Sequence, residues 1–233
     1  MTRKLSWDGF LNVRDLGGLP LANGGETAFG RVARSETPSF LTDQGWRELR
    51  DHGVRTLIDL RCPSEGGYET RFGLRRLCEP VFRQDDPEFV ARVRDVRDTA
   101  TFYRVLVGFS HDSITRAVAA VADAPAGGVL IHCHSGRDRT GIVSALLLAV
   151  AGVPPEAIAD DYVATRAALE PRHEQDVAGA ETPEDQEWLE RIHDVRPETI
   201  LDTLEAVGDP VAYLLAGGAT ADQVERVRAR LAA

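Results

Sequence analysis

Gly127 to Ala151 reads GGVLIHCHSGRDRTGIVSALLLAVA, and this stretch changes character twice. Gly127–Cys133 begins with glycines and continues as a short apolar run, which predicts a buried strand. Thr140–Ala151 is apolar on nearly every side, which predicts a buried helix that ends at Gly152. A short polar loop joins the two. The stretch therefore predicts a strand, a loop and a helix, as in an α/β fold.

On both sides of this unit, strands and helices continue to alternate. Predicted strands are Val54–Arg61 and, more weakly, Arg76–Phe82. Predicted helices are Thr42–His52, Pro87–Phe109, a segment from Pro154 to about Leu169, Pro183–His193, Pro197–Val207 and Ala221–Leu231. This alternation predicts a central, mainly parallel sheet flanked by helices. We expect a single domain over residues 1–233, in which residues from about 197 form a helical C-terminal extension.

The residues Cys133 to Arg139, called the phosphate loop below, place five residues between a cysteine and an arginine. A loop of this length between a strand and a helix can turn its N–H groups inward and form a nest for an anion. The helix start adds N–H donors and a positive dipole end, and the same field favours a thiolate at Cys133. Arg139 can hold two phosphate oxygens at once, and Gly136 lets the loop turn tightly. The spacing thus predicts Cys133 as a nucleophile and Arg139 as a phosphate clamp.

The other residues of this segment are predicted to surround the phosphate: His134, Ser135, Gly136, Arg137 and Thr140. Thr140 follows Arg139 directly and is expected to donate a hydrogen bond to the cysteine sulfur. Histidines on both sides of Cys133 raise the question of a metal. Consecutive residues of a strand point to alternate faces, so these side chains would serve one ion poorly. We predict neither a metal nor an organic cofactor.

The phosphate loop resembles that of the protein-tyrosine phosphatase superfamily. It is most similar to the HCxxGKDRTG loop of bacterial tyrosine, dual-specificity and phosphoinositide phosphatases. The resemblance covers most of the chain and includes, in family order, Asn12–Gly18, Arg31–Ser35, Ile58–Arg61 with Glu65, Asp160–Tyr162 and the tail from Pro197. It implies hydrolysis of phosphomonoesters through a phosphocysteine intermediate. Phosphotyrosine proteins are the implied substrates, with phosphoserine, phosphothreonine and phosphoinositides as further ones.

Two positions depart from the family pattern. Arg137 replaces a lysine, and His134 stands where a small residue is common. Since Lys4 is the only lysine of the chain, the first change fits a general use of arginine. Arginine is nevertheless larger and forked, so the rim of the pocket changes shape.

A general acid should protonate the leaving oxygen. The tyrosine phosphatases of higher organisms take it from a Trp-Pro-Asp motif, which this chain lacks. Asp138 is our first candidate, because related families with an aspartate before the arginine are thought to use it; a bracing role for its carboxylate is the alternative. Asp59 is the second candidate, although an ion pair with an arginine is its favoured role. Asp86 is the third, and an exposed turn is favoured for it.

Several arginines have both a structural and a substrate-binding interpretation. Arg14 is expected to pair with Asp15 near the phosphate loop, with direct substrate contact as the alternative. Arg61 is expected to bind Glu65, with the phosphate as its alternative partner. The eight arginines from Arg71 to Arg104 are expected to form a solvated helical face. A contact with a second anionic group of a substrate, or a lid over the pocket, is the alternative for that segment.

The composition narrows the class of protein. The formal net charge of −10 argues against a general nucleic-acid binder. Nothing resembles a signal peptide, and no apolar stretch approaches the ~20 residues of a membrane span. The 3 cysteines do not form a disulfide framework. We expect a cytoplasmic protein that acts on phosphorylated proteins or small phosphomonoesters, without nucleic-acid binding or integral membrane association.

Three other interpretations remain open at this stage. A phosphatase of a small metabolite (a nucleotide or sugar phosphate) or of a phosphoinositide fits the same loop, because the rim sets the substrate range. A catalytically inactive phosphate-binding module is possible in principle, although Cys133, Asp138 and Arg139 are all intact. Sulfur transfer of the rhodanese type is disfavoured by the Arg-Thr-Gly start of the helix.

Overall fold

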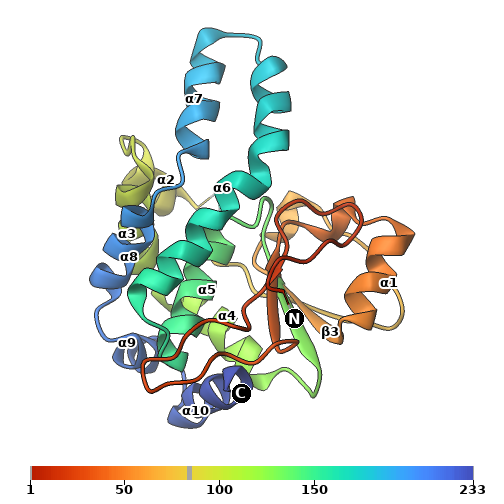
Figure 1. Ribbon diagram of the computed structural model, residues 1–233. Helices are drawn as coiled ribbons and strands as arrows, with labels where there is room; N and C mark the ends of the chain where they lie inside the picture. Colours follow the sequence, from red (N-terminus) through yellow and green to blue (C-terminus); the bar gives the residue numbers. More distant parts are fainter. Residues whose placement is uncertain (1, 83–85, 233) are drawn as a thin grey trace.

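The computed structural model describes residues 2–82 and 86–232. Within those ranges, a five-stranded sheet has the order β1-β2-β5-β3-β4 (Figure 1). Strands β2, β5, β3 and β4 are parallel, and the short edge strand β1 is antiparallel to β2. The prediction of a mainly parallel sheet is confirmed. The strands are β1 (Arg14–Asp15), β2 (Val32–Ser35), β3 (Val54–Asp59), β4 (Arg75–Cys78) and β5 (Gly128–His132).

Helices cover both faces of this sheet, with α1 on one face and α4 and α5 on the other (Figure 1). The described helices are α1 (Asp43–Asp51), α2 (Pro87–Val93), α3 (Thr99–Phe109), α4 (His111–Asp123), α5 (Asp138–Ala151), α6 (Pro155–Ala178), α7 (Pro183–His193), α8 (Pro197–Val207), α9 (Pro210–Ala216) and α10 (Ala221–Leu231). Two single turns of 3₁₀ helix, η1 (Pro38–Phe40) and η2 (Pro63–Glu65), follow β2 and β3.

The central strand β5 is buried on both faces, and its side chains alternate between two apolar cores. Leu130 belongs to a smaller cluster that includes Trp46 and Leu49 of α1. Val129 and Ile131 belong to a larger cluster built mainly from helices, including α4 and α5. Successive side chains of a strand point to opposite faces, so burial on both faces explains the continuous apolar run of this segment.

The carboxyl ends of three parallel strands meet at one edge of the sheet. Ser35 of β2 and Asp59 of β3 are both in register with His132, the last residue of β5. The loops that follow these strands therefore gather at this edge, where α/β proteins place their sites. The phosphate loop begins with the next residue, Cys133.

Several helix boundaries differ from the predictions. The single helix predicted over Pro87–Phe109 is two helices, α2 and α3. Asp98 ends the connection between them, because its side chain accepts a backbone N–H bond and caps the start of α3. Helix α6 continues through Pro171 to Ala178 instead of ending near Leu169. Helices α4 and α9 have no counterpart among the predicted elements.

Helices α6 and α7 form an arm that extends beyond the rest of the molecule (Figure 1). Helix α7 packs chiefly against α6. The C-terminal helices return to the body, where α8 packs against α3 and α6, and α10 packs against α4 and α5. Among the residues that the structure describes, none of the helices combines the length and apolarity that a membrane span requires.

Candidate active site

The phosphate loop is anchored from outside through its carbonyl groups. Three bonds, each 2.9 Å long, run from Thr37 N to His134 O, from Asn12 Nδ2 to Ser135 O and from Arg34 Nη2 to Gly136 O. In a trans peptide, the N–H points opposite to the preceding carbonyl. The N–H groups of residues 135–137 therefore point away from the scaffold, and those of Ser135 and Gly136 donate to no group in the described part of the chain. This backbone geometry is that of an anion nest.

Gly136 is required by the tight turn of this loop. Its φ is +71°, in the left-handed region that favours glycine. A Cβ at this position would lie 2.5 Å from the carbonyl carbon and oxygen of Ser35. The close approach of β2 to the loop thus leaves no room for a side chain.

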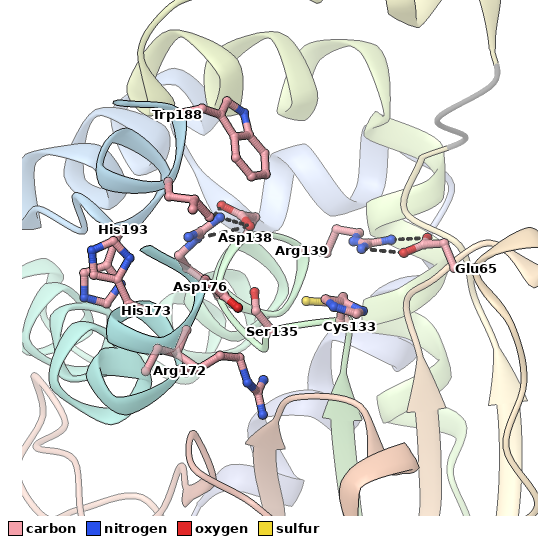
Figure 2. A pocket seen from close by; sticks show the side chains of 14 residues that line it. Glu65, Cys133, Ser135, Asp138, Arg139, Arg172, His173, Asp176, Trp188 and His193 are labelled. Carbon is pink, nitrogen blue, oxygen red and sulfur yellow. Dashed lines mark hydrogen bonds and ion pairs between the residues drawn. The ribbon is translucent and has the colours of Figure 1, made fainter. Parts of the chain in front are cut away.

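Cys133 lies beside a cavity of about 500 Å³ (Figure 2). The cavity is lined by Glu65, Cys133, His134, Ser135, Arg137, Asp138, Arg139, Leu169, Arg172, His173, Asp176, Trp188, Leu189 and His193. The phosphate loop forms one wall, and α6 and α7 form the facing wall. No described residue of the segment Arg71–Arg104 lines this cavity. Of the described arginines in that segment, Arg97 lines a neighbouring cavity that also reaches Asp138.

Arg139 is oriented by Glu65 of η2. Its Nη1 and Nη2 atoms donate to the two carboxylate oxygens at 2.5 and 2.9 Å. Burial raises the pKa of Glu65, but the Arg139 bonds outweigh it and hold that pKa below its ordinary value. The predicted Arg61–Glu65 pair is therefore wrong. Arg61 instead makes a two-point pair with Asp59, with both N–O distances 3.0 Å, because the two residues flank the end of β3.

Asp138, the first residue of α5, accepts two kinds of hydrogen bond. Tyr103 Oη donates to its Oδ1 at 2.8 Å, and Arg137 Nη2 donates to its Oδ2 at 3.0 Å. Burial raises the pKa of this carboxyl, but the Arg137 charge and these bonds bring the pKa below its ordinary value. Without a substrate, the site thus favours the carboxylate form of Asp138.

The two other candidate acids lie outside the cavity wall. Asp59 is buried and binds Arg76 at 2.7 Å in addition to Arg61, so its favoured role as an arginine partner is confirmed. Asp86 accepts backbone N–H bonds at 2.9 and 3.1 Å and caps the start of α2. It lines a different cavity, which also includes Cys62 but not Cys133. Neither position suits proton transfer at the phosphate loop.

Arg14 does not pair with Asp15, and this prediction is wrong. Arg14 Nε donates to Asp161 of α6 at 2.9 Å, and Arg34 Nη1 donates to the other Asp161 oxygen at 2.7 Å. Arg3 also binds this carboxylate. Burial lowers the pKa of Arg14 to about 10. Neighbouring strand residues point to opposite faces, which separates Arg14 from Asp15 and directs the arginine to α6 instead of the cavity.

Thr140 and His134, two of the predicted phosphate-binding residues, differ in their exposure to solvent. Thr140 is buried, and its Oγ1 has no partner in the described part of the chain, so the predicted bond to the cysteine sulfur is absent. Helix α5 begins at Asp138, so Thr140 is already enclosed in the first turn. His134 is exposed and lines the cavity mouth. Partial burial and the nearby Arg139 lower the pKa of His134, which favours its neutral form.

His132, the last residue of β5, contacts the backbone of Cys133 and was not among the predicted site residues. Its Nε2 lies 2.6 Å from Tyr68 Oη, and its Nδ1 lies 3.2 Å from the Cys133 carbonyl. Burial lowers the pKa of His132 to about 4, so the ring is neutral. The carbonyl can only accept, so Nδ1 carries the hydrogen and Tyr68 donates to Nε2. No cluster of three metal-ligating side chains occurs among the described residues.

The sequence signals for the overlooked residues differ in strength. Glu65 and Asp161 lie in segments that carry the family resemblance, so their importance was visible but their partners were not. Tyr68, Tyr103 and Trp188 belong to no motif, and only the folded chain brings them to the site. These contacts join distant segments, which the local pattern around Cys133 cannot reveal.

Comparisons with known proteins agree with this geometry. A family model described as "Tyrosine phosphatase family" matches residues 5–233. A Cupriavidus necator protein that carries the name of a tyrosine-protein phosphatase is 32% identical over 168 residues, covering 68% of this chain and 62% of its own. The tyrosine-protein phosphatase of Nostoc commune is 31% identical, covering 56% and 46%. The triple specificity protein phosphatase PtpB of Mycobacterium tuberculosis is 29% identical, covering 58% and 60%. The chain thus spans between 46% and 62% of the length of these relatives.

Proposed function

The chain belongs to the tyrosine phosphatase family, and from this membership we propose that it hydrolyses phosphomonoesters through a phosphocysteine intermediate. The observation that carries the proposal is the outward anchoring of the phosphate-loop carbonyls. It turns the N–H groups of residues 135–137 away from the scaffold that binds these carbonyls. A dianionic phosphate is the group that such a nest and a forked arginine would hold.

In the first step, the Cys133 thiolate attacks phosphorus in line with the leaving oxygen. The S–P bond forms as the P–O bond breaks, and the leaving oxygen takes a proton. Arg139 and the loop N–H groups stabilise the charge on the three equatorial oxygens. In the second step, water attacks phosphorus and gives a proton back to the group that served as acid, the S–P bond breaks, inorganic phosphate is released and the thiolate is regenerated.

We assign the proton of the first step to Asp138. Among the three candidate aspartates, it alone lines the cavity with Cys133. Its carboxylate must first gain a proton, because Arg137 and Tyr103 lower its pKa in the free protein. A phosphate dianion bound beside it would repel the carboxylate and raise that pKa. Arg137 can also turn toward the phosphate and weaken its bond to Asp138.

Phosphotyrosine in proteins is the proposed primary substrate. The named activities of the Cupriavidus and Nostoc relatives support it. The Mycobacterium relative is named for triple specificity, which supports a wider range of phosphomonoesters. The cavity of about 500 Å³ has room for a side chain as large as phosphotyrosine. A location in the cytoplasm stays a prediction, based on 3 cysteines that do not form a disulfide framework.

We also propose that residues 1–233 act as one catalytic unit. The packing of α8 on α3 and α6, and of α10 on α4 and α5, supports the expectation that the extension from residue 197 belongs to the phosphatase domain.

The experiment is phosphate release by the wild type and by Cys133→Ser, without added metal. The substrates are a phosphotyrosine peptide, a phosphoserine peptide, phosphoinositides, nucleoside monophosphates and sugar phosphates. We expect turnover of the phosphotyrosine peptide by the wild type alone, with inhibition by vanadate. Turnover by Cys133→Ser at the wild-type rate would refute the mechanism. Absence of any turnover by the wild type would favour a phosphate-binding module.

A further inference from the structure

Trp188 of α7 exposes a large apolar side chain beside the phosphate loop. The indole is 51% exposed, whereas Trp7 and Trp46 are 5% and 3% exposed. In Figure 2 its ring points from α7 toward the side of the cavity where Asp138 lies. Exposing an indole to water is unfavourable, because burying apolar ring surface contributes free energy in proportion to the area covered. A substrate that covers this ring would gain that contribution.

Trp188 lies between two cavities that both reach the phosphate loop. The first has about 500 Å³ and the second about 390 Å³, and both are lined by Arg137, Asp138, Arg139 and Trp188. Their other apolar lining residues are Leu169, Leu189, Phe82, Val93, Val96 and Phe102. When the loop binds a phosphate, the group esterified to that phosphate extends into these cavities. The apolar residues that line these cavities would suit an aromatic group.

The position of α7 is set at its base by two histidines. The rings of His173 on α6 and His193 on α7 stack with centroids 3.9 Å apart and planes inclined by 4°. His193 Nε2 also lies 2.9 Å from Glu170 Oε2. These contacts fix the end of α7 nearest the cavity. Trp188 thus projects from a helix whose position is fixed by contacts with α6.

We propose that Trp188 is a specificity-determining residue against which the aryl ring of the substrate packs, so that aryl phosphomonoesters such as phosphotyrosine are selected over alkyl ones such as phosphoserine. This inference rests on the proposed function and adds to it the residue that selects the aryl substrate. The phosphate is bound by the loop in both cases. The difference between the two substrates arises at the indole, because only phosphotyrosine carries a ring that can cover it.

The experiment compares kcat/KM for a phosphotyrosine and a phosphoserine peptide of the same flanking sequence. For Trp188→Ala, we expect the phosphotyrosine value to fall about tenfold, mainly through KM, which corresponds to ~1.4 kcal/mol. The phosphoserine value should stay within about twofold. Trp188→Phe should recover most of the loss, because it restores a ring. Glu187→Ala, on the same helix and outside both cavities, is the matched control and should behave as the wild type.

An equal loss on both peptides would overturn the proposal, since it would indicate a disturbed arm instead of ring recognition. Thermal unfolding of each variant checks that the fold is intact. Binding supplies a readout that does not need turnover: in isothermal titration calorimetry, Cys133→Ser should bind phenyl phosphate more tightly than inorganic phosphate. That difference should vanish in Cys133→Ser/Trp188→Ala, and its persistence would also overturn the proposal. Failure of turnover with this difference intact would refute the proposed function alone.

Discussion

Tyr103 donates its hydroxyl hydrogen to Asp138 at 2.8 Å, across 35 residues of sequence. The same hydroxyl lies 2.9 Å from that of Tyr162. A bond donated to a carboxylate stabilises its charged form and lowers its pKa. Tyr103 and Arg137 therefore control when Asp138 can hold the proton that a general acid must give.

Replacement of Tyr103 by Phe should raise the pKa of Asp138. A general acid works in its protonated form, so activity falls as pH rises through its pKa. We expect the alkaline limb of kcat against pH to move to higher pH by about half a unit to one unit. Tyr213→Phe is the control, because its hydroxyl bonds to the Val107 carbonyl away from the cavity. An alkaline limb that stays in place would argue against Asp138 as the acid.

The loss of activity caused by removing the general acid should depend on the leaving group of the substrate. Asp138→Asn should lower kcat for a phosphoserine peptide by ~10²–10⁴-fold, the usual contribution of a general acid. The loss should be far smaller for 4-nitrophenyl phosphate, because nitrophenolate leaves without a proton. Asp86→Asn should change neither rate, apart from a small loss of stability at the start of α2. Equal losses of Asp138→Asn on both substrates would indicate a bracing role.

Glu65 should matter for catalysis although it does not touch the phosphorus. Glu65→Gln keeps the shape but removes the charge that holds both Arg139 nitrogens. We expect kcat/KM to fall roughly 10- to 100-fold, within the effect of removing one preorganised contact. Glu69→Gln, an exposed neighbour, should retain wild-type values. Steady-state kinetics on a phosphotyrosine peptide would check this, and an unchanged Glu65→Gln would show that Arg139 needs no partner.

The strand-loop-helix unit was predictable because its information is local. A buried strand, a spacing of five residues and an apolar helix all lie within 25 residues, and the structure contains them as β5, the phosphate loop and α5. Helices α7, α8 and α10 were predictable for the same reason, since prolines or a capping threonine mark where they begin. Helix α4 lacks a side-chain cap and follows α3 directly, so no local signal separates it.

The partners of the charged residues could not be predicted from the sequence. Arg14 and Asp161 are 147 positions apart, and Glu65 and Arg139 are 74 apart. Nearby charges of opposite sign, such as Asp15 for Arg14, were the obvious partners by distance along the chain. In the folded chain, the alternation of side chains along a strand and the gathering of loops at the sheet edge determine the partners, whatever their separation in sequence. The charge pattern predicts that pairs form, whereas the topology decides which ones.

Asp161 should be the most costly of these carboxylates to neutralise. Burial raises its pKa, but Arg14, Arg34 and Arg3 together hold it far below the ordinary value. Asp161→Asn would leave buried arginine charges uncompensated, at a cost of about 3–5 kcal/mol of unfolding free energy. Because the folded-state pKa is depressed, this stabilisation is complete at neutral pH and is lost only as pH falls below the ordinary carboxyl range. Urea unfolding at pH 7 measures the loss, with Asp160→Asn as the exposed neighbour for control.

His132 should make the protein less stable in mild acid. Its folded-state pKa of about 4 lies below the 6.5 of an unfolded histidine, because burial disfavours the charged ring. The neutral ring is therefore the stabilising form. Its contribution is complete above pH 6.5 and falls as pH decreases toward 4, by roughly 3 kcal/mol in total. Half of that change should already be visible between pH 7.5 and pH 5.

The contribution of His132 can be separated from that of other groups by comparing urea unfolding across this range in the wild type and in His132→Gln. The variant lacks the titrating ring, so its stability should change less with pH, even if its value at pH 7.5 is lower. Tyr68→Phe should behave differently, because it keeps the ring and removes only the bond to Nε2. We expect it to lose about 1–3 kcal/mol at pH 7.5 and to retain a pH dependence. If the unfolding free energy of the wild type and of His132→Gln changed equally with pH, another group would be the one that titrates in this range. Protonation of His132 would then not be the cause of the loss of stability in acid.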